Sequence, residues 1–397
     1  MESNLTDILK KVETGERLSF EDGMRLFRSR DIFAIGRMAN MVRERQNGRR
    51  AYYVVNHHIN YSNICKNACK FCAFSRRPGE EGAYQMALEE IFGRGGEAAQ
   101  SGATELHIVG GTHPDLPLDW YLDMLSGLKE RFPELHLQAF TAIEIAQMAE
   151  ISGLPIRQTL QKLIEAGLGS IPGGGAEIFS PRVRAALCPE KLSGEKWLKV
   201  MQTAHELGIK SNATMLYGHI ETYQERTEHL LRLRELQDEC LHSGQAGGFQ
   251  AFIPLSFHPE NTRMAHLSGP SAVDDLKTLA ISRLLLDNFP HIKAFWIMLG
   301  VKLSQVSLCF GTDDLNGTVV YEKITHSAGA RTPEHPQVDE IVSLIMEAGF
   351  EPVERDTVYN LIEREGANWH RIEDKKQTTA ARQPKSQTAL PAGRQDC

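Results

Sequence analysis

The sequence predicts an α/β fold: a (β/α) barrel of the TIM type, full or partial, with an N-terminal helical segment and a C-terminal extension. Strand-like and helical patterns alternate from about residue 50 to about residue 300. Several helical stretches end at a glycine, such as Gly102, Gly167 and Gly208, and a strand-like stretch follows Gly102 and Gly208. This alternation indicates βα units, and therefore a parallel sheet with right-handed crossovers. Six or more such units fit a closed or partly closed barrel better than an open sheet.

The spacing of apolar side chains defines the individual elements. Apolar residues at 32, 35, 38, 39 and 42 form the stripe of an N-terminal helix. Strands are expected at 52–59, 106–109, 135–143, 209–217, 248–255 and 291–298. Helices are expected near 83–101, 118–131, 156–166, 194–207, 222–240, 271–288 and 337–348.

These elements suggest a division of the chain into four parts. Residues 1–50 are expected to form an N-terminal helical segment and residues 51–310 the barrel core. Residues 311–374 are expected to form a C-terminal extension packed on the barrel. Residues 375–397 are polar with proline and glycine, which is typical of a disordered tail.

Composition and charge exclude several function classes. The chain has 44 Lys and Arg against 51 Asp and Glu, a net charge of −7 that argues weakly against nucleic-acid binding. It contains no run of about 18 apolar residues, so no membrane span is expected. The N-terminal residues lack a basic segment followed by an apolar one, so no secretory signal is expected and a cytoplasmic location is predicted.

The cysteines give the strongest indication of chemistry. The chain has seven, an odd number that argues against a disulfide framework and favours metal or redox use. Cys65, Cys69 and Cys72 have the spacing C-x3-C-x2-C in the loop after the first expected barrel strand. Cys188, Cys240, Cys309 and Cys397 are isolated and are interpreted as packing or surface residues.

Two metal sites are compatible with this triplet. Structural zinc would need a fourth ligand, and His57 and His58 lie seven or eight residues upstream. A [4Fe–4S] cluster normally takes four cysteines, so three local ones indicate a cluster with one iron open to another ligand. A non-catalytic zinc or iron–sulfur module is therefore one alternative to an enzyme.

The triplet, with Phe71 just before its third cysteine, resembles the signature of the radical S-adenosylmethionine (SAM) superfamily. The resemblance implies that Cys65, Cys69 and Cys72 hold a [4Fe–4S] cluster and that SAM chelates its fourth iron. It also implies a partial or full (β/α) barrel with the cluster loop after the first strand. An electron donor such as flavodoxin or ferredoxin would be the protein partner.

Three further motifs follow expected strands, where a barrel places its ligand groups. Gly110, Gly111 and Thr112 are similar to the superfamily's glycine motif for the methionine amino group, with Thr112 in place of the common Glu. Glu177, after three glycines, resembles the acidic residue that binds ribose, whereas Leu216 and Gly218 resemble the motif that lines adenine. Taken singly, each motif could also be an ordinary turn, loop or buried strand.

Longer segments give a closer resemblance. NHHINYSNICKNACKFCAFSR, AFTAIEI, GSIPGGGAEIFSPRVR, HELGIKSNATMLYGHIET and GGFQAFIPLSFHPENT resemble the aminofutalosine synthase family of menaquinone biosynthesis, over about residues 50–370. The resemblance implies that a 5′-deoxyadenosyl radical adds to 3-[(1-carboxyvinyl)oxy]benzoate. Rearrangement and decarboxylation would then give 6-amino-6-deoxyfutalosine, with methionine released. Dehypoxanthine futalosine cyclase, or a related radical SAM synthase, is the alternative within the same class.

This implied substrate is an aromatic dicarboxylate, so its carboxylates need hydrogen-bond donors. His58 or His258 and one arginine, Arg263, are the catalytic candidates for this task. The wider set of polar residues at strand ends is His58, Asn60, Arg76, Thr141, Glu144, Asn212, His219, His258 and Arg263. Glu144 cannot bind a carboxylate while it is ionised, so it is expected to contact the adenosine sugar or to orient an arginine.

Overall fold

The computed structural model describes residues 5–330 and 336–373. Its helices are α1 Thr6–Thr14, α2 Phe20–Arg28, α3 Ile32–Asn47, α4 Leu88–Gln100, α5 Leu118–Arg131, α6 Ala142–Ser152, α7 Ile156–Glu165, α8 Pro181–Leu187, α9 Gly194–Glu206, α10 Tyr223–His242, α11 Ala272–Leu285, α12 Trp296–Leu299, α13 Val301–Ser307, α14 Ile324–Ser327 and α15 Val338–Glu347, with a 3-10 turn at Leu308–Phe310. Its strands are β1 Arg50–Val54, β2 Asn56–Ile59, β3 Glu105–Ile108, β4 His136–Ala139, β5 Ser170–Ile171, β6 Lys210–Tyr217, β7 Gly248–Ser256, β8 His291–Ile292, β9 Asp314–Gly317, β10 Glu351–Glu354, β11 Leu361–Glu365 and β12 Asn368–Ile372.

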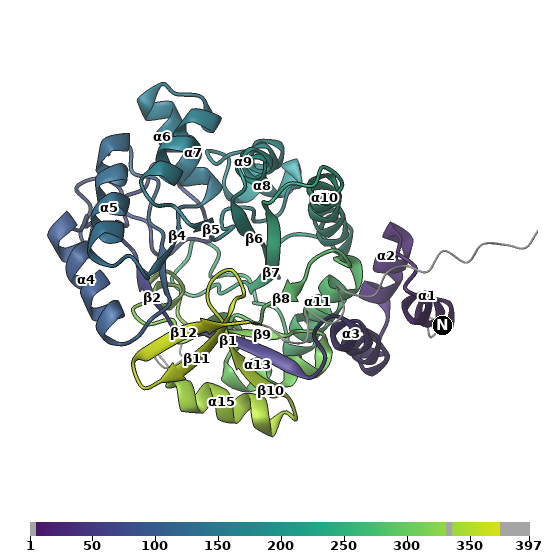
Figure 1. Cartoon of the computed structure of the whole chain (residues 1–397). Coiled ribbons are helices and arrows are strands. Elements are labelled where there is room, and N and C mark those ends of the chain that lie inside the picture. The colour runs from purple at the N-terminus through teal and green to yellow at the C-terminus, as the bar shows by residue number, and fades with distance from the viewer. Residues whose placement is uncertain (1–4, 331–335, 374–397) are drawn as a thin grey trace, which may run out of the picture.

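A curled sheet of seven parallel strands forms the wall of a barrel. Its strand order, β2-β3-β4-β5-β6-β7-β8, follows the chain, as successive βα units require. Helices α4 to α11 lie around the outside of this sheet (Figure 1). The predicted α/β barrel architecture is confirmed, since each strand pairs in parallel with the next strand along the chain.

The segment after β8 closes the gap between β8 and β2. Asp313 N–H donates to the Ile292 carbonyl at 3.1 Å, and Ala294 N–H donates to the Asp314 carbonyl at 2.8 Å. On the other side, His58 N–H donates to the Val320 carbonyl at 2.7 Å. Residues 313–320 thus bond to the barrel wall on both sides. We therefore propose that this segment folds with the barrel, and the division near residue 310 stays a prediction.

The expected first strand, 52–59, is two strands in different sheets. β1 lies between β10 and β9 in a three-stranded sheet, whereas β2 begins the barrel. Residues 51–60 are all buried, so apolar periodicity could not show this change of sheet. Asn56 holds the junction, because its amide donates to Glu105 at 3.0 Å and accepts from Val319 N–H at 2.9 Å.

Two other expected strands are shorter than predicted because helices follow them at once. The expected strand 135–143 is β4 followed by α6, which begins after a capping box formed by Thr141 and Glu144. The expected strand 291–298 is the two-residue β8 followed by α12. The T-x-x-E pattern of 141–144 was a usable signal for a helix start.

The N-terminal segment is helical as predicted. α2 and α3 pack against α10 and α11 on the outside of the barrel (Figure 1). The C-terminal elements α15, β10, β11 and β12 lie together beside β1 (Figure 1). Over residues 5–330 and 336–373, no helix is long and apolar enough to cross a membrane. The predicted tail, 375–397, lies outside the described residues.

Candidate active site

A cavity of about 310 Å³ lies inside the barrel and among the loops at the C-terminal ends of its strands. Barrel enzymes place their ligand-binding groups at this end of the strands. Side chains from β2 to β9 and from the loops that follow them line the cavity. They are His58, Cys65, Asn67, Cys69, Phe71, Cys72, Ala73, Phe74, Ser75, His107, Val109, Gly110, Gly111, Thr112, Gln138, Thr141, Ile143, Pro172, Gly174, Gly175, Glu177, Lys191, Asn212, Thr214, Leu216, Ile253, Leu255, Phe257, His258, Phe295, Met298, Asn316, Glu322, Ile324, Thr325 and Ala328.

The loop after β2 brings Cys65, Cys69 and Cys72 to this cavity. Thr112 N–H donates to the Cys65 sulfur at 3.3 Å, which ties the cysteine loop to the glycine motif after β3. Gly111 is required at this contact, since a Cβ there would lie 2.2 Å from the Ile64 carbonyl oxygen. Gly111 therefore allows the two loops to contact each other. Gly110 and Gly111 also line the cavity.

Three thiols on one loop are the type of ligand that iron–sulfur clusters take. Within the described ranges, no three His, Cys, Asp or Glu side chains are grouped to hold one metal ion. In a [4Fe–4S] cluster each cysteine binds a different iron, so the sulfurs need not converge on one point. The nearby Asn67 Oδ1 is buried without a hydrogen-bond partner in the described structure, so a ligand at this loop would find a free acceptor.

A buried ion pair lies beside the cysteines. Lys191 Nζ is 2.6 Å from Glu177 Oε1 and 5.4 Å from the centre of the Phe71 ring. Burial lowers the pKa of Lys191, but Glu177 and the thiols of Cys69 and Cys188 outweigh it, so its pKa is raised and the amine stays charged. Sequence analysis identified Glu177 and Phe71 but missed Lys191, because nothing in its local sequence separates it from a surface lysine.

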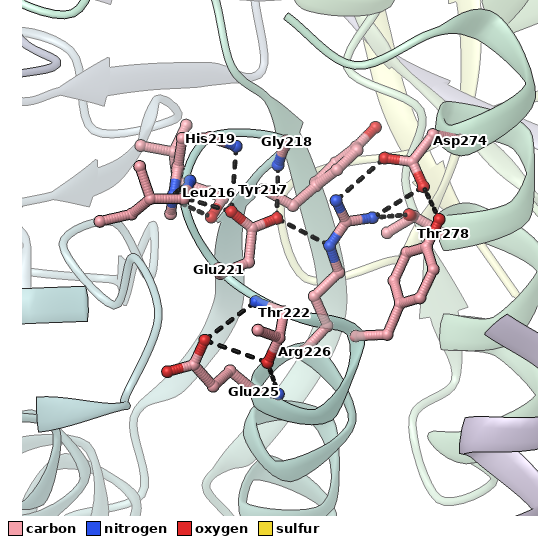
Figure 2. A network of polar contacts seen from close by, with 12 residues as sticks. Leu216, Tyr217, Gly218, His219, Glu221, Thr222, Glu225, Arg226, Asp274 and Thr278 are labelled. Carbon is pink, nitrogen blue, oxygen red and sulfur yellow. Dashed lines mark hydrogen bonds and ion pairs between the residues drawn. The ribbon is translucent and has the colours of Figure 1, made fainter. Parts of the chain in front are cut away.

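The turn after β6 places Leu216 in the cavity wall. The Glu221 carboxylate accepts from Gly218 N–H at 2.6 Å and from His219 N–H at 2.9 Å (Figure 2). His219 Nε2 lies 3.0 Å from the Leu216 carbonyl oxygen, so the imidazole bridges the turn (Figure 2). Arg226 lies between Glu221, at 2.7 Å, and Asp274, at 2.9 Å (Figure 2). The turn is therefore held from several directions.

Gly218, predicted to contact the cofactor, lies outside the lining of the cavity. Its φ is +88°, a conformation that favours glycine, and a Cβ there would meet Pro270 at 2.6 Å. The structure therefore explains this glycine by the path of the chain. Its role towards the cofactor stays a prediction.

Glu144, also predicted to contact the cofactor, lies behind the cavity wall. Its carboxylate accepts from Tyr61 OH at 2.6 Å, from Gly110 N–H at 3.0 Å and from Thr141 N–H at 2.7 Å. Burial raises the pKa of this carboxyl. Glu144 therefore positions Gly110 and Thr141, which do line the cavity.

The predicted carboxylate-binding residues are placed differently from one another. His58 and His258 line the cavity, and His258 Nε2 is 2.8 Å from the Met298 carbonyl oxygen. Arg263 is exposed and donates to the Ala68 carbonyl, so its guanidinium supports the cysteine loop from outside the cavity. Arg76 likewise donates to the carbonyls of Ala73 and Ser75. Neither arginine is in the lining.

Among the other polar candidates, Thr141 and Asn212 line the cavity, whereas Asn60 and His219 do not. Asn60 donates to the Val109 carbonyl at 3.1 Å, a backbone contact between neighbouring strand ends. Of the polar candidates, His58, Thr141, Asn212 and His258 are thus the ones that line the cavity.

Comparison with known proteins agrees with this geometry. Residues 59–233 match the model of the radical SAM superfamily, and residues 246–367 match that of the CofH/MqnC C-terminal region. The chain is 47% identical to aminodeoxyfutalosine synthase of Thermus thermophilus, over 93% of this chain and 98% of that one. It is 37% identical to cyclic dehypoxanthine futalosine synthase of Halalkalibacterium halodurans, over 90% and 95%.

The fold also matches solved structures. The crystal structure of methylornithine synthase (PylB) superposes with a TM-score of 0.69 at 18% identity, covering 87% of this chain and 96% of that one. At such low identity the match concerns the fold alone. The sequence matches, in contrast, extend over nearly the whole chain. The chain therefore belongs to the radical SAM superfamily, within the group that includes the aminodeoxyfutalosine synthases.

Proposed function

We propose that this protein is an aminodeoxyfutalosine synthase of menaquinone biosynthesis by the futalosine pathway. It would join the 5′-deoxyadenosyl group of SAM to 3-[(1-carboxyvinyl)oxy]benzoate, with loss of a carboxylate. The products would be 6-amino-6-deoxyfutalosine and methionine. The identity of 47% over 93% of the chain, with a cysteine loop that faces the cavity, carries this proposal.

Cys65, Cys69 and Cys72 would hold a [4Fe–4S] cluster, and SAM would bind next to it. When bound, the reduced cluster supplies the electron that cleaves the sulfonium of SAM. Gly110, Gly111 and Thr112 would leave backbone groups for the methionine part, as their place in the lining allows.

Glu177 and Leu216 would bind the adenosine part of SAM. The Glu177 carboxylate can accept from ribose hydroxyls, and Leu216 offers an apolar surface to the base. Lys191 Nζ lies 2.6 Å from Glu177 Oε1, so its positive charge balances the charge of this carboxylate. The same ammonium group lies close to the cysteines. Phe71, 5.4 Å from the same ammonium group, completes this side of the pocket.

The rest of the wall would protect a primary carbon radical from quenching. Such a radical takes hydrogen from whatever is nearest, so the pocket must exclude water and hold the acceptor carbon close. A set of apolar side chains on β7 and in the segments that follow β7 and β8 also lines the cavity. They are Ile253, Leu255, Phe257, Phe295 and Met298.

Cyclic dehypoxanthine futalosine synthase activity is the second candidate. Relatives with that name are 37% identical over 90% of the chain, against 47% for the synthase. Anaerobic incubation of the reconstituted enzyme with SAM and each substrate in turn separates the two. The synthase proposal predicts an adenosyl adduct of the enolpyruvyl ether. It fails if only free 5′-deoxyadenosine forms with the ether while dehypoxanthine futalosine is cyclised.

We also propose reduction by flavodoxin or ferredoxin and a cytoplasmic location. The competing proposal of a non-catalytic zinc or iron–sulfur module predicts a protein that does not cleave SAM. Metal analysis after anaerobic reconstitution tests it: about four irons per chain favour the enzyme, and zinc without iron favours the module.

A further inference from the structure

The cavity contains few positive charges for a doubly negative substrate. Among the described lining residues, the side chains of permanent charge are Glu177, Lys191 and Glu322, and no arginine is present. Lys191 is paired with Glu177 at 2.6 Å. Glu322 accepts from Thr325 N–H at 2.8 Å. A substrate carboxylate must therefore find its donors among neutral side chains.

Two stacked histidines lie in the cavity wall. His58 of β2 and His107 of β3 are partners in register, with ring centres 4.4 Å apart and ring planes at 12°. Both line the cavity, and only 6% of the His58 surface is exposed. His58 Nε2 is buried and has no hydrogen-bond partner in the described part of the chain. An unpaired buried ring nitrogen costs free energy unless a ligand satisfies it.

The next strand fixes the second ring. Gln138, the register partner of His107 on β4, donates through Nε2 to Ser170 Oγ at 3.2 Å. Its Oε1 therefore faces His107 Nδ1, at 3.1 Å, so that nitrogen carries the hydrogen. His107 is thus held as a neutral donor to Gln138, and its ring packs flat against His58.

We propose that His58 binds one carboxylate of the substrate through its ring N–H and takes up one proton from solvent when it does so. This inference rests on the proposed function and names the group that recognises the aromatic acid. His107 restricts the uptake to a single proton, because a second charge on a ring stacked at 4.4 Å would be repelled.

The surroundings of His58 agree with a neutral ring before binding. Burial, followed by His107 and His57, holds the pKa of His58 well below its usual value. The charged groups facing the pair are Glu105, Lys293 and Glu322, which act on His107. A carboxylate within hydrogen-bond distance raises the pKa of a neighbouring base by about 1–3 units. Binding of the acid and uptake of the proton are thus coupled.

Calorimetric titration of the reconstituted, SAM-loaded enzyme tests the coupling. Benzoate and the enolpyruvyl ether are titrated, without reductant, at about pH 6.5 and pH 8.5 in two buffers of different ionisation enthalpy. We expect net proton uptake and tighter binding at the lower pH, and little uptake with weaker binding at the higher pH, because a protonated His58 attracts the carboxylate. Binding of the acids to the wild-type enzyme without proton uptake would overturn the inference. This measurement requires no variant.

His58→Gln should bind both acids at least about tenfold more weakly and take up no proton, with cluster content and SAM affinity unchanged. His136→Gln is the matched control, because His136 is a histidine of β4 with a pKa that burial lowers but it does not line the cavity. Wild-type uptake in His58→Gln would show that the carboxylate binds elsewhere. Benzoate binding that depends on His58, without conversion of the ether, would contradict the proposed function and leave this subsite standing.

Discussion

The thiols that face the cavity differ from the other cysteines in their surroundings. Cys65 and Cys72 are half-buried on a loop, whereas Cys240 is buried among helices and strands at His205. Cys188 is also buried, yet it lies close enough to Cys69 and Lys191 to influence the pKa of both. We therefore expect position on the loop after β2, more than burial alone, to separate cluster ligands from packing residues.

Replacement of a single cysteine tests this distinction. Cys65→Ser, Cys69→Ser or Cys72→Ser should lower the iron content after anaerobic reconstitution from about four to about one or less per chain, because a cluster with two protein ligands is not retained. Iron analysis and visible absorption measure the loss. Cys240→Ser is the matched control and should keep the full cluster.

A second prediction concerns Lys191. Lys191→Met should weaken SAM binding by about tenfold or more, because it leaves the buried Glu177 carboxylate without a partner. Equilibrium binding of SAM to the reconstituted enzyme measures this, and Lys191→Arg should restore part of the affinity. The exposed Lys199→Met serves as control. Unchanged SAM affinity in Lys191→Met would contradict the placement of SAM against the ion pair.

At the scale of single residues, the sequence was informative where a short motif marked the residues. The cysteine spacing and the glycines after β3 led directly to residues of the cavity wall, whereas Gly218 lies outside it. Arg263 was predicted and Lys191 was missed for the same reason. Both belong to loops whose path is decided by tertiary packing, so local sequence does not show which cation turns inwards.

Among the elements, the turn from β6 to α10 is held by several buried polar contacts. The Glu221 side chain is fully buried and accepts hydrogen bonds from two backbone N–H groups and from Arg226 (Figure 2). Despite burial, hydrogen bonding to His219 and the charge of Arg226 keep the pKa of Glu221 well below its usual value. The carboxylate is therefore ionised at neutral pH, and the shape of the turn depends on it.

Glu221→Gln should lower the free energy of unfolding by about 2 kcal/mol, since Arg226 keeps Asp274 but loses its second partner. It should also raise KM for SAM, because Leu216 loses its fixed position. Thermal unfolding and steady-state kinetics measure the two effects. Glu225→Gln, in the capping box at the start of α10, should lower stability without a change in KM. Equal KM effects in both variants would contradict a specific role for the turn.

The elements show where periodicity fails as a guide. Helices with a clear apolar stripe and a glycine stop were predicted to within a few residues, as for α7 and α9. The two-residue strand β5 and the short helix α8 were missed, since neither is long enough to show a period. The split between β1 and β2 could not be predicted, because pairing with β9 and β10 involves residues some 260 to 300 positions away.

For the molecule as a whole, buried neutral histidines predict acid sensitivity. Burial lowers the pKa of His205 and of His229 to about 3. The unfolded chain binds a proton at each site near pH 6.5, whereas the folded chain does so only near pH 3. Stability therefore falls as pH decreases between these values, by roughly 1.4 kcal/mol per pH unit for each histidine.

Melting temperatures between pH 7 and pH 4 test this expectation. His229→Gln should show a smaller decrease than the wild type, because its amide can still donate to the Thr214 carbonyl without taking up a proton. His242→Gln, on the exposed end of the same helix α10, should behave like the wild type. An identical pH profile of the melting temperature for His229→Gln and wild type would show that His229 does not cause the loss of stability at low pH.

The architecture itself could be predicted with most of the site because βα repetition places every strand end at one face of the barrel. The closure between β8 and β2 by residues 313–320 could not, since those residues show no strand periodicity and β2 lies some 260 positions away in the sequence. The polar row of His58, His107 and Gln138 also depends on register between strands, which a single sequence does not reveal.

The most direct test of the central claim is the fate of the adenosyl group in a single anaerobic reaction. The reconstituted enzyme is reduced and incubated with SAM carrying a labelled adenosine and with 3-[(1-carboxyvinyl)oxy]benzoate, and the products are analysed by mass spectrometry. The account predicts that the label appears in a decarboxylated adduct, with one methionine released per adduct. Label found only in 5′-deoxyadenosine, with the ether recovered intact, would contradict it.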